Sequence, residues 1–260
     1  MRPPHPFRIF GPSHLAVLGA TAVVTAALVV LARRAGHGAT TGGGRVTARV
    51  TTLIAWSLSA LLLADEAAVA GFAAHANLPT LKDHLPFQLC DWVILACVAA
   101  LLRRRQLAYE LAYFWGLSGT LQALLTPDLA EDFPSLHFIT FQVLHAGTVV
   151  AVLYLTLGLG MRPRPRSIVR AWVWLQGYVA VTAAIDWLLD SNYGYLRHKP
   201  VQASLYDYLG PWPFYLLSLE ALSLVLFLAC YAPFALRDRL RRASGATVPA
   251  APAATMEPLP

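Results

Sequence analysis

Residues 15–34 read LAVLGATAVVTAALVVLARR. The first 18 of these residues carry no charge and are mostly apolar, and Arg33 and Arg34 follow directly. A helix rises about 1.5 Å per residue, so a run of this length matches the hydrocarbon core of a bilayer. The run is also longer than the roughly 7–15 apolar residues of a secretory signal peptide. We therefore interpret it as a transmembrane helix.

The rest of the chain repeats this pattern. Of its 260 residues, 57% are apolar and 13% are charged, whereas a soluble domain is about one quarter charged. This composition, with a mean hydropathy of +0.54, argues against a soluble enzyme, a disordered regulator and a nucleic-acid-binding protein. The sequence predicts an all-α, polytopic membrane protein whose single domain, residues 1–242, has seven transmembrane helices: 15–32, 50–72, 85–102, 107–125, 136–159, 171–189 and 212–236.

The basic residues predict the orientation of these helices. Cytoplasmic loops of membrane proteins carry an excess of Lys and Arg. Fifteen arginines follow the first, third, fifth and seventh spans, whereas five basic residues lie on the opposite side. The alternation predicts an N-terminus outside and a C-terminus in the cytoplasm, where residues 243–260 would form a disordered Ala/Pro-rich tail.

Polar and reactive side chains concentrate in the outer half of the predicted spans. Placing a charged side chain at the centre of a membrane helix costs at least about 2.5–3.5 kcal/mol, so each is a functional candidate. A polar cavity open to the outer face would explain this distribution, and hydrogen bonding between helices is the alternative. Glu110 is the exception, because it lies near the inner end of its span, within expected reach of arginines 103–105. The outer candidates lie about 5–14 Å below the helix ends: Asp186, Gln122, Cys90, Asp91, Asp65, Glu66, Glu220 and His145.

Cys90 and His145 are the pair with the most specific chemistry. A thiolate is a nucleophile, and a buried thiol needs a nearby base in order to react. Both residues lie on spans that descend from the outer face, at depths that differ by about 6 Å, so they can meet if the helices are neighbours. Asp91, Asp186 or Glu220 could orient the imidazole. The alternative is that both are ordinary core residues.

Other chemistries fit the sequence less well. A retinal protein needs a lysine inside a span, and both lysines, Lys82 and Lys199, lie in loops. The cysteines lie in apolar runs, which predicts no disulfide, and we expect Cys97 to pack rather than react. We expect no metal and no other cofactor, although zinc stays open because further histidines lie at the outer face: His75, His84, His137 and His198.

Several strings of residues resemble those of a known family. They are Tyr113-Phe114-Trp115-Gly116-Leu117 followed by Gly119, Gln122 and Leu125-Thr126-Pro127-Asp128-Leu129; Phe133-Pro134; residues 141–145; Asn192-Tyr193 with Tyr195-Leu196 and Lys199-Pro200; and Leu209-Gly210-Pro211-Trp212-Pro213. Between about residues 85 and 220, the chain resembles the YwaF-like family of bacterial integral membrane proteins. That family looks related to the eukaryotic transmembrane protein 164 group of lipid acyltransferases.

The resemblance implies acyl transfer in a bacterial cell membrane, with membrane lipids as the substrates. The positions that match a catalytic cysteine and histidine are Cys90, in the string QLCD, and His145, in FQVLH. Cys90 would then attack a phospholipid ester, and His145 would act as general base and then general acid. Asn192, Gln122 or a backbone amide would stabilise the oxyanion. The alternative function is a solute carrier or receptor with a proton-coupled, outward-facing polar cavity.

Overall fold

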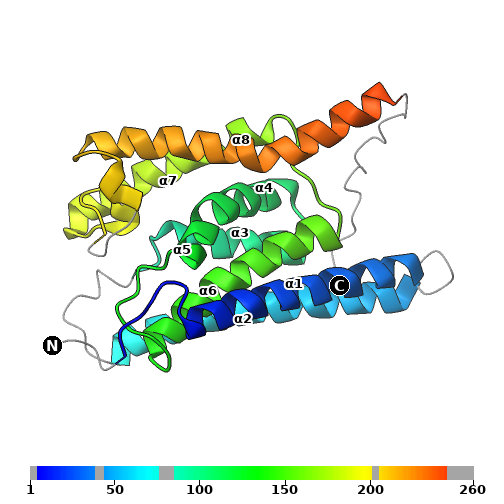
Figure 1. The fold of residues 1–260 in the computed structure, drawn as a ribbon, viewed down its shortest axis with the longest axis horizontal. Helices are drawn as coiled ribbons and strands as arrows, with labels where there is room; N and C mark the ends of the chain where they lie inside the picture. The colour runs from blue at the N-terminus through cyan, green and yellow to red at the C-terminus, as the bar shows by residue number, and fades with distance from the viewer. Residues whose placement is uncertain (1–4, 39–43, 76–84, 201–204, 245–260) are drawn as a thin grey trace.

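The apolar runs of the sequence form helices that lie along one common axis (Figure 1). The computed structural model describes residues 5–38, 44–75, 85–200 and 205–244, and this part of the chain is helical apart from loops and one isolated bridge between Pro6 and Glu131. Five described helices are long and apolar enough to cross a membrane. They are α1 (Pro12–Gly38), α2 (Gly44–His75), α6 (Leu136–Leu153) with its continuation η4 (Tyr154–Gly158), α7 (Ser167–Leu189) and α8 (Phe214–Ala243).

Two of the predicted spans form shorter helices. The third is α3 (Leu89–Arg103), which has 15 residues and begins after the cap residue Gln88 rather than at residue 85. The fourth is divided into α4 (Gln106–Trp115), the π-helical turn η3 (Gly116–Thr120) and α5 (Leu121–Leu125). The structure therefore confirms an all-helical membrane architecture, with five helices of spanning length among the described residues.

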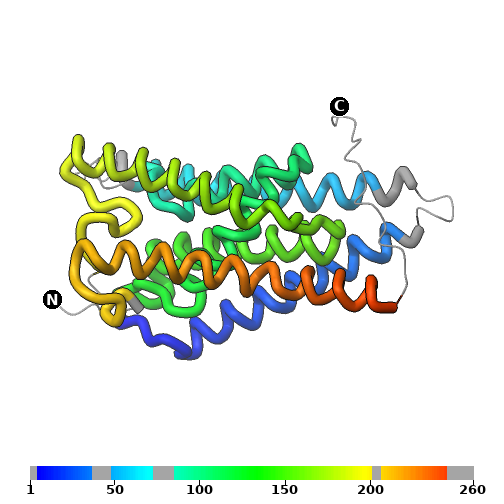
Figure 2. The backbone as a smooth tube through the Cα atoms, turned by 90° about the horizontal axis from the view of Figure 1, so that it is seen from above, coloured from blue at the N-terminus to red at the C-terminus, as the bar shows by residue number. Residues whose placement is uncertain are grey.

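The long helices run alternately in opposite directions and form layers, and α4, η3 and α5 follow one another in a single direction (Figures 1 and 2). α1, α2 and α6 pack on one another on one side, α7 and α8 lie on the other side, and α3 and α4 lie between them. α3 therefore contacts both α2 and α6.

The bundle has two different ends. Residues 5–11, 85–88, 126–135 and 190–200 join at one end, which we call the loop end, through bonds such as Phe7 N–H to Ala130 O at 3.1 Å and Gly194 N–H to Gln88 Oε1 at 2.9 Å. At the opposite end, which we call the arginine-rich end, α1 and α3 finish, α4 and α7 begin and α8 finishes. Arg33 there donates to Leu157 O at 2.9 Å, and Arg162 pairs with Asp238 at 2.5 Å.

Large aromatic side chains fill the centre, and their polar atoms are hydrogen-bonded. Tyr109 is fully buried, and its hydroxyl lies 3.0 Å from Thr156 Oγ1. Trp115 donates its indole N–H to Ala171 O at 3.1 Å. The outward faces instead expose large apolar side chains, as expected for helices in contact with lipid: Val23, Leu53, Leu95, Val169, Leu217 and Leu228 are examples.

Glu110 has a different partner from the one expected. Its carboxylate is fully buried and pairs with Arg170 at 2.5 Å, and it accepts a bond from Gln106 at 2.8 Å. The expected partners, arginines 103–105, lie at the turn between α3 and α4, whereas Glu110 faces α7. Of the predicted tail, residues 245–260 lie outside the described part of the chain.

Candidate active site

Cys90 and His145 meet between α3 and α6. Cys90 is the second residue of α3, and its sulfur lies 3.4 Å from His145 Nε2. His145 is 5% exposed. A long side chain on a helix leans toward the N-terminus of that helix. For α6 this direction is toward the loop end, which closes the difference in depth between the two residues.

A second contact, with the backbone of α6, determines which nitrogen of His145 can act as a base. Nδ1 lies 2.6 Å from the carbonyl oxygen of Phe141. A carbonyl only accepts hydrogen bonds, so Nδ1 carries the proton and the lone pair of Nε2 faces the thiol of Cys90. The ring of Phe141 also stacks on the imidazole, with centroids 4.0 Å apart. The preceding turn of α6 thus holds the imidazole in the tautomer that a general base requires.

The imidazole is therefore not oriented by a carboxylate, which corrects the expectation from the sequence. Asp91 Oδ2 accepts the backbone N–H of Gln88 at 2.8 Å and caps α3. Glu66 of α2 lies near Asp91, and its Oε1 is buried without a hydrogen-bond partner in the described part of the chain. Successive helical residues point about 100° apart, so Asp91 points away from the side of α3 on which Cys90 meets α6.

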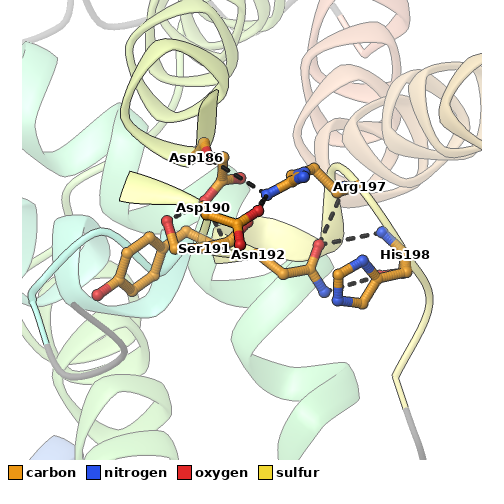
Figure 3. Close-up of polar contacts among 7 residues, drawn as sticks. Asp186, Asp190, Ser191, Asn192, Arg197 and His198 are labelled. Atoms are coloured by element: carbon orange, nitrogen blue, oxygen red, sulfur yellow. Dashed lines mark hydrogen bonds and ion pairs between the residues drawn. The ribbon is translucent and has the colours of Figure 1, made fainter. Parts of the chain in front are cut away.

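Asp186 orders the loop that follows α7. Its Oδ1 accepts the hydroxyl of Ser191 at 2.8 Å and the backbone N–H of Tyr193 at 2.7 Å (Figure 3). Arg197 contacts the carbonyl of Asp186 at 3.4 Å and the carboxylate of Asp190 at 2.6 Å. Asp186 is thus a loop-forming residue, and its bonds lie away from the imidazole.

Asn192 is used inside the same loop. Its Oδ1 accepts the backbone N–H groups of Arg197 and His198 at 3.0 and 3.1 Å, and its Nδ2 donates to His198 O at 2.9 Å (Figure 3). These three bonds fold residues 192–198 back on themselves. Both polar atoms of the Asn192 amide therefore take part in bonds within this loop.

This loop holds the start of α3 beside Cys90. Gly194 donates its N–H to Gln88 Oε1 at 2.9 Å, and Leu85 donates its N–H to the Tyr193 hydroxyl at 2.8 Å. Gly194 has a φ of 61°, and a Cβ there would lie 2.8 Å from the Tyr178 hydroxyl, so glycine is required. A chain of contacts thus leads from Asp186 through this loop to the start of α3.

Gln122 and Glu220 lie apart from the Cys90–His145 contact. The side chain of Gln122 is exposed. Glu220 of α8 accepts the indole N–H of Trp172 and the amide of Gln176, both at 2.9 Å, and so joins α8 to α7. Its carboxylate therefore has a structural role.

Two features of the site were not expected from the sequence. Thr120, which is 1% exposed, donates its hydroxyl toward the Cys90 sulfur at 3.9 Å. It lies on the π-helical turn η3, and such turns are frequent at functional sites. The turn approaches α6 closely at Gly116, where a Cβ would lie 3.3 Å from Val152 and 3.5 Å from Thr148. Gly116 belongs to the string quoted for the family resemblance, which is the one signal that pointed here.

Tyrosines surround the loop end above the site. The hydroxyl of Tyr195 donates to Asp128 Oδ2 at 3.1 Å, and its ring packs edge-on against Tyr206 at 5.5 Å. Burial, followed by the nearby tyrosine and cysteine, raises the pKa of Tyr206 to about 12. Burial, followed by the carboxylate of Asp128, likewise raises the pKa of Tyr195. Both tyrosines therefore remain neutral hydrogen-bond donors at physiological pH.

Within the described part of the chain, no three His, Cys, Asp or Glu side chains converge to form a site for zinc. His137 and His198 are exposed there, and His84 lies outside the described residues. Cys97 is fully buried in the apolar core, on the inner side of Cys90.

Comparisons with known proteins agree with this architecture. The model of the TMEM164 family matches residues 9–231, which include Cys90 and His145. An uncharacterized protein from Treponema pallidum (strain Nichols) is 27% identical over 156 residues, covering 59% of this chain and 63% of the relative. The match thus spans less than two thirds of that relative, and no solved structure matches the chain. With its apolar helices of membrane-spanning length, this multi-pass integral membrane protein belongs to the TMEM164 family.

Proposed function

We propose that this protein transfers fatty acyl groups between membrane lipids through an acyl-thioester on Cys90. The observation that carries the proposal is the 3.4 Å contact between the Cys90 sulfur and the unprotonated nitrogen of His145. A nucleophile within reach of a base, with the base held by a third group, is the arrangement that nucleophilic catalysis requires. Here the third group is the carbonyl of Phe141. Membership of the TMEM164 family is consistent with this type of reaction.

The reaction has two balanced halves. In the first, His145 Nε2 takes the proton of Cys90, the sulfur bonds to the ester carbonyl carbon, and the bond from that carbon to the lipid oxygen breaks. The departing lysophospholipid oxygen takes the proton back from Nε2. In the second half, the hydroxyl of an acceptor lipid gives its proton to Nε2 and attacks the thioester carbon. The carbon–sulfur bond then breaks, and Cys90 regains its proton.

The depth of the site suits a phospholipid ester. We propose that α3 is the third of seven spans and that α4, η3 and α5 together form the fourth, with the arginine-rich end in the cytoplasm and the N-terminus outside. With 15 residues, α3 is about 22 Å long, which is shorter than the roughly 30 Å hydrocarbon core. Cys90, at the start of α3, would then lie below the outer headgroups, near the level of the ester carbonyls. The membrane would be a bacterial cell membrane, and the protein would belong to the YwaF-like subtype.

The bonding of the carboxylates supports an enzyme over a carrier. A proton-coupled carrier needs carboxylates that exchange protons during transport. Asp186 and Glu220, which the carrier alternative singles out, each accept two hydrogen bonds from fixed donors. These bonds use the two carboxylates in contacts that hold the loop 190–198 and join α8 to α7. Acyl transfer instead uses the two residues whose reactive atoms face each other.

Acyl transfer in vesicles tests the proposal. The purified protein would be reconstituted with phosphatidylcholine carrying isotope-labelled acyl chains and with an unlabelled lysophospholipid acceptor, and labelled product would be measured by mass spectrometry. Cys90→Ala should lower transfer by about 10³-fold or more, because a nucleophile is lost. Cys97→Ala is the matched control, since it removes a buried thiol on the same helix, and it should retain transfer. Transfer that survives in Cys90→Ala would overturn the proposal.

A further inference from the structure

Gln142 is a buried amide that has no hydrogen-bond partner within the described part of the chain. Its side chain is 4% exposed, and neither Oε1 nor Nε2 is bonded. Leaving a buried polar group unsatisfied costs about 1–3 kcal/mol. A leucine at this position of α6 would avoid that cost, so a glutamine here calls for a role other than packing.

Gln142 lies one helical turn from the base. It precedes His145 by three residues, and side chains at this spacing are neighbours on a helix, with Cβ atoms about 5–6 Å apart. The ring of His145 leans over the turn that contains Phe141 and Gln142. Phe141 stacks on the imidazole at 4.0 Å, and Gln142 occupies the adjacent row of the helix surface. The amide therefore lies within one helical turn of the imidazole that faces Cys90.

A second donor lies at the nucleophile itself. Cys90 is in the first turn of α3, where backbone N–H groups have no partner within the helix. The N–H of Asp91 is bonded to Gln88 O at 3.1 Å. The N–H of Cys90 belongs to the same residue as the sulfur, so it lies within reach of the oxygen of a carbonyl that the sulfur attacks.

We propose that Gln142 Nε2 and the backbone N–H of Cys90 form the oxyanion hole for acyl transfer. The inference rests on the function proposed above. When the sulfur bonds to the ester carbon, the carbonyl electrons move to the oxygen, and the two N–H groups donate to the resulting anion. When the tetrahedral intermediate collapses, those electrons reform the carbonyl and the lipid oxygen leaves. A buried donor that is unbonded in the resting protein is available for this transient charge.

The side chains expected from the sequence do not fill this role. Gln122 is exposed, and the amide of Asn192 is bonded within the loop. The hydroxyl of Thr120 donates toward the sulfur rather than into free space. Gln142 combines burial, an unbonded N–H group and proximity to the base.

Two probes separate this role from a structural one. The p-nitrophenyl ester of a medium-chain fatty acid acylates a thiol through a tetrahedral oxyanion, whereas iodoacetamide alkylates the same thiol by direct displacement without one. The full-length protein would carry Cys97→Ala and Cys230→Ala, so that the gain in intact mass reports on Cys90. The rate constants of acylation and alkylation would be measured for each variant under the same conditions.

Gln142→Leu should lower the acylation rate by about 10²–10³-fold, the usual effect of losing one oxyanion donor, and leave alkylation within about twofold. His145→Ala should lower both rates, because it removes the base that forms the thiolate. Thr148→Val, which removes another buried and unbonded hydroxyl of α6, should change neither rate. Gln142→Met serves as a second variant of similar shape if the leucine variant fails to fold.

Two outcomes would overturn the inference: acylation of the Gln142 variants within about threefold of the parent, or an equal fall in acylation and alkylation. A failure of the proposed function would give other results. The ester would not acylate Cys90 in the parent protein, or the Cys90→Ala variant would still become acylated.

Discussion

The surroundings of Glu110 and those of Cys90 and His145 bury polar groups in different ways. Near the arginine-rich end, Glu110 is fully buried and both of its carboxylate oxygens are bonded, one to Arg170 at 2.5 Å and one to Gln106 at 2.8 Å. Toward the loop end, His145 presents its unprotonated nitrogen to a thiol, which is a weak donor, and Gln142 is unbonded. A buried group with full bonding stabilises one structure, whereas a group with spare bonding capacity is available to a substrate.

Asp186 differs from Cys90 in what its bonds do, although both lie near the loop end. Its Oδ1 accepts two bonds that shape the loop 190–198, whereas its Oδ2 is buried without a partner in the described part of the chain. Proximity to the loop end is therefore not sufficient for a chemical role. We therefore propose a chemical role for the Cys90–His145 pair and a supporting role for Asp186, Glu220 and Glu110. Four substitutions test that division.

His145→Ala should have the largest effect of the four. It removes the base that takes the proton of Cys90, and general base catalysis typically contributes about 10²–10⁴-fold. The rate of labelled acyl transfer between lipids is the measurement, with the thermal unfolding temperature as a check on folding. A transfer rate within about tenfold of wild type would remove His145 from the chemistry.

Asp186→Ala should have an intermediate effect. Losing the acceptor for Ser191 and for the Tyr193 N–H should lower the free energy of unfolding by about 1–3 kcal/mol. We expect acyl transfer to fall by about tenfold, equivalent to about 1.4 kcal/mol, because the loop that holds the start of α3 loosens. Asp186→Asn keeps one oxygen acceptor and should recover most of the rate. A carrier would give the opposite result, with transport lost in Asp186→Asn.

Arg170→Ala should affect stability alone. It leaves Glu110 buried without its cation, and the free energy of unfolding should fall by about 1–3 kcal/mol, between the values for exposed and fully buried pairs. Arg170 is itself 43% exposed, which keeps the effect below that of a fully buried pair. Adding Glu110→Gln should restore part of the stability. A fall in acyl transfer per folded molecule would contradict the structural role of this end.

Cys97→Ala should have the smallest effect. The thiol is buried in the apolar core, so its loss leaves a small cavity that costs about 1 kcal/mol or less. Acyl transfer should be unchanged. Loss of transfer comparable to that in Cys90→Ala would place Cys97 in the reaction.

The helical architecture could be predicted from the sequence because apolar length alone determines which segments can cross a bilayer. The division of the fourth predicted span into α4, η3 and α5 could not be predicted from the sequence. The turn η3 forms where Gly116 approaches Val152 and Thr148, residues more than 30 positions away. The shortness of α3 likewise depends on the cap at Gln88, whose side chain bonds Gly194. Such contacts between distant residues leave no local pattern in the sequence.

The candidate site could be predicted only in part from the sequence. Depth along each helix suggested that Cys90 and His145 can meet, and the structure brings them together. The group that orients the imidazole was wrongly assigned to a carboxylate, because the carbonyl of Phe141 belongs to the backbone and has no signature in the sequence. Gln142 was overlooked because only burial reveals that its amide is unbonded.

Intact-mass analysis after incubation with mixed phospholipids tests the central claim most directly. Wild-type protein should gain the mass of a fatty acyl group, and hydroxylamine should remove it, as expected for a thioester. Cys90→Ala should gain no such mass, His145→Ala should gain it much more slowly, and Cys97→Ala should match the wild type. An acyl adduct that persists in Cys90→Ala, or lipid turnover that survives that substitution, would contradict the account.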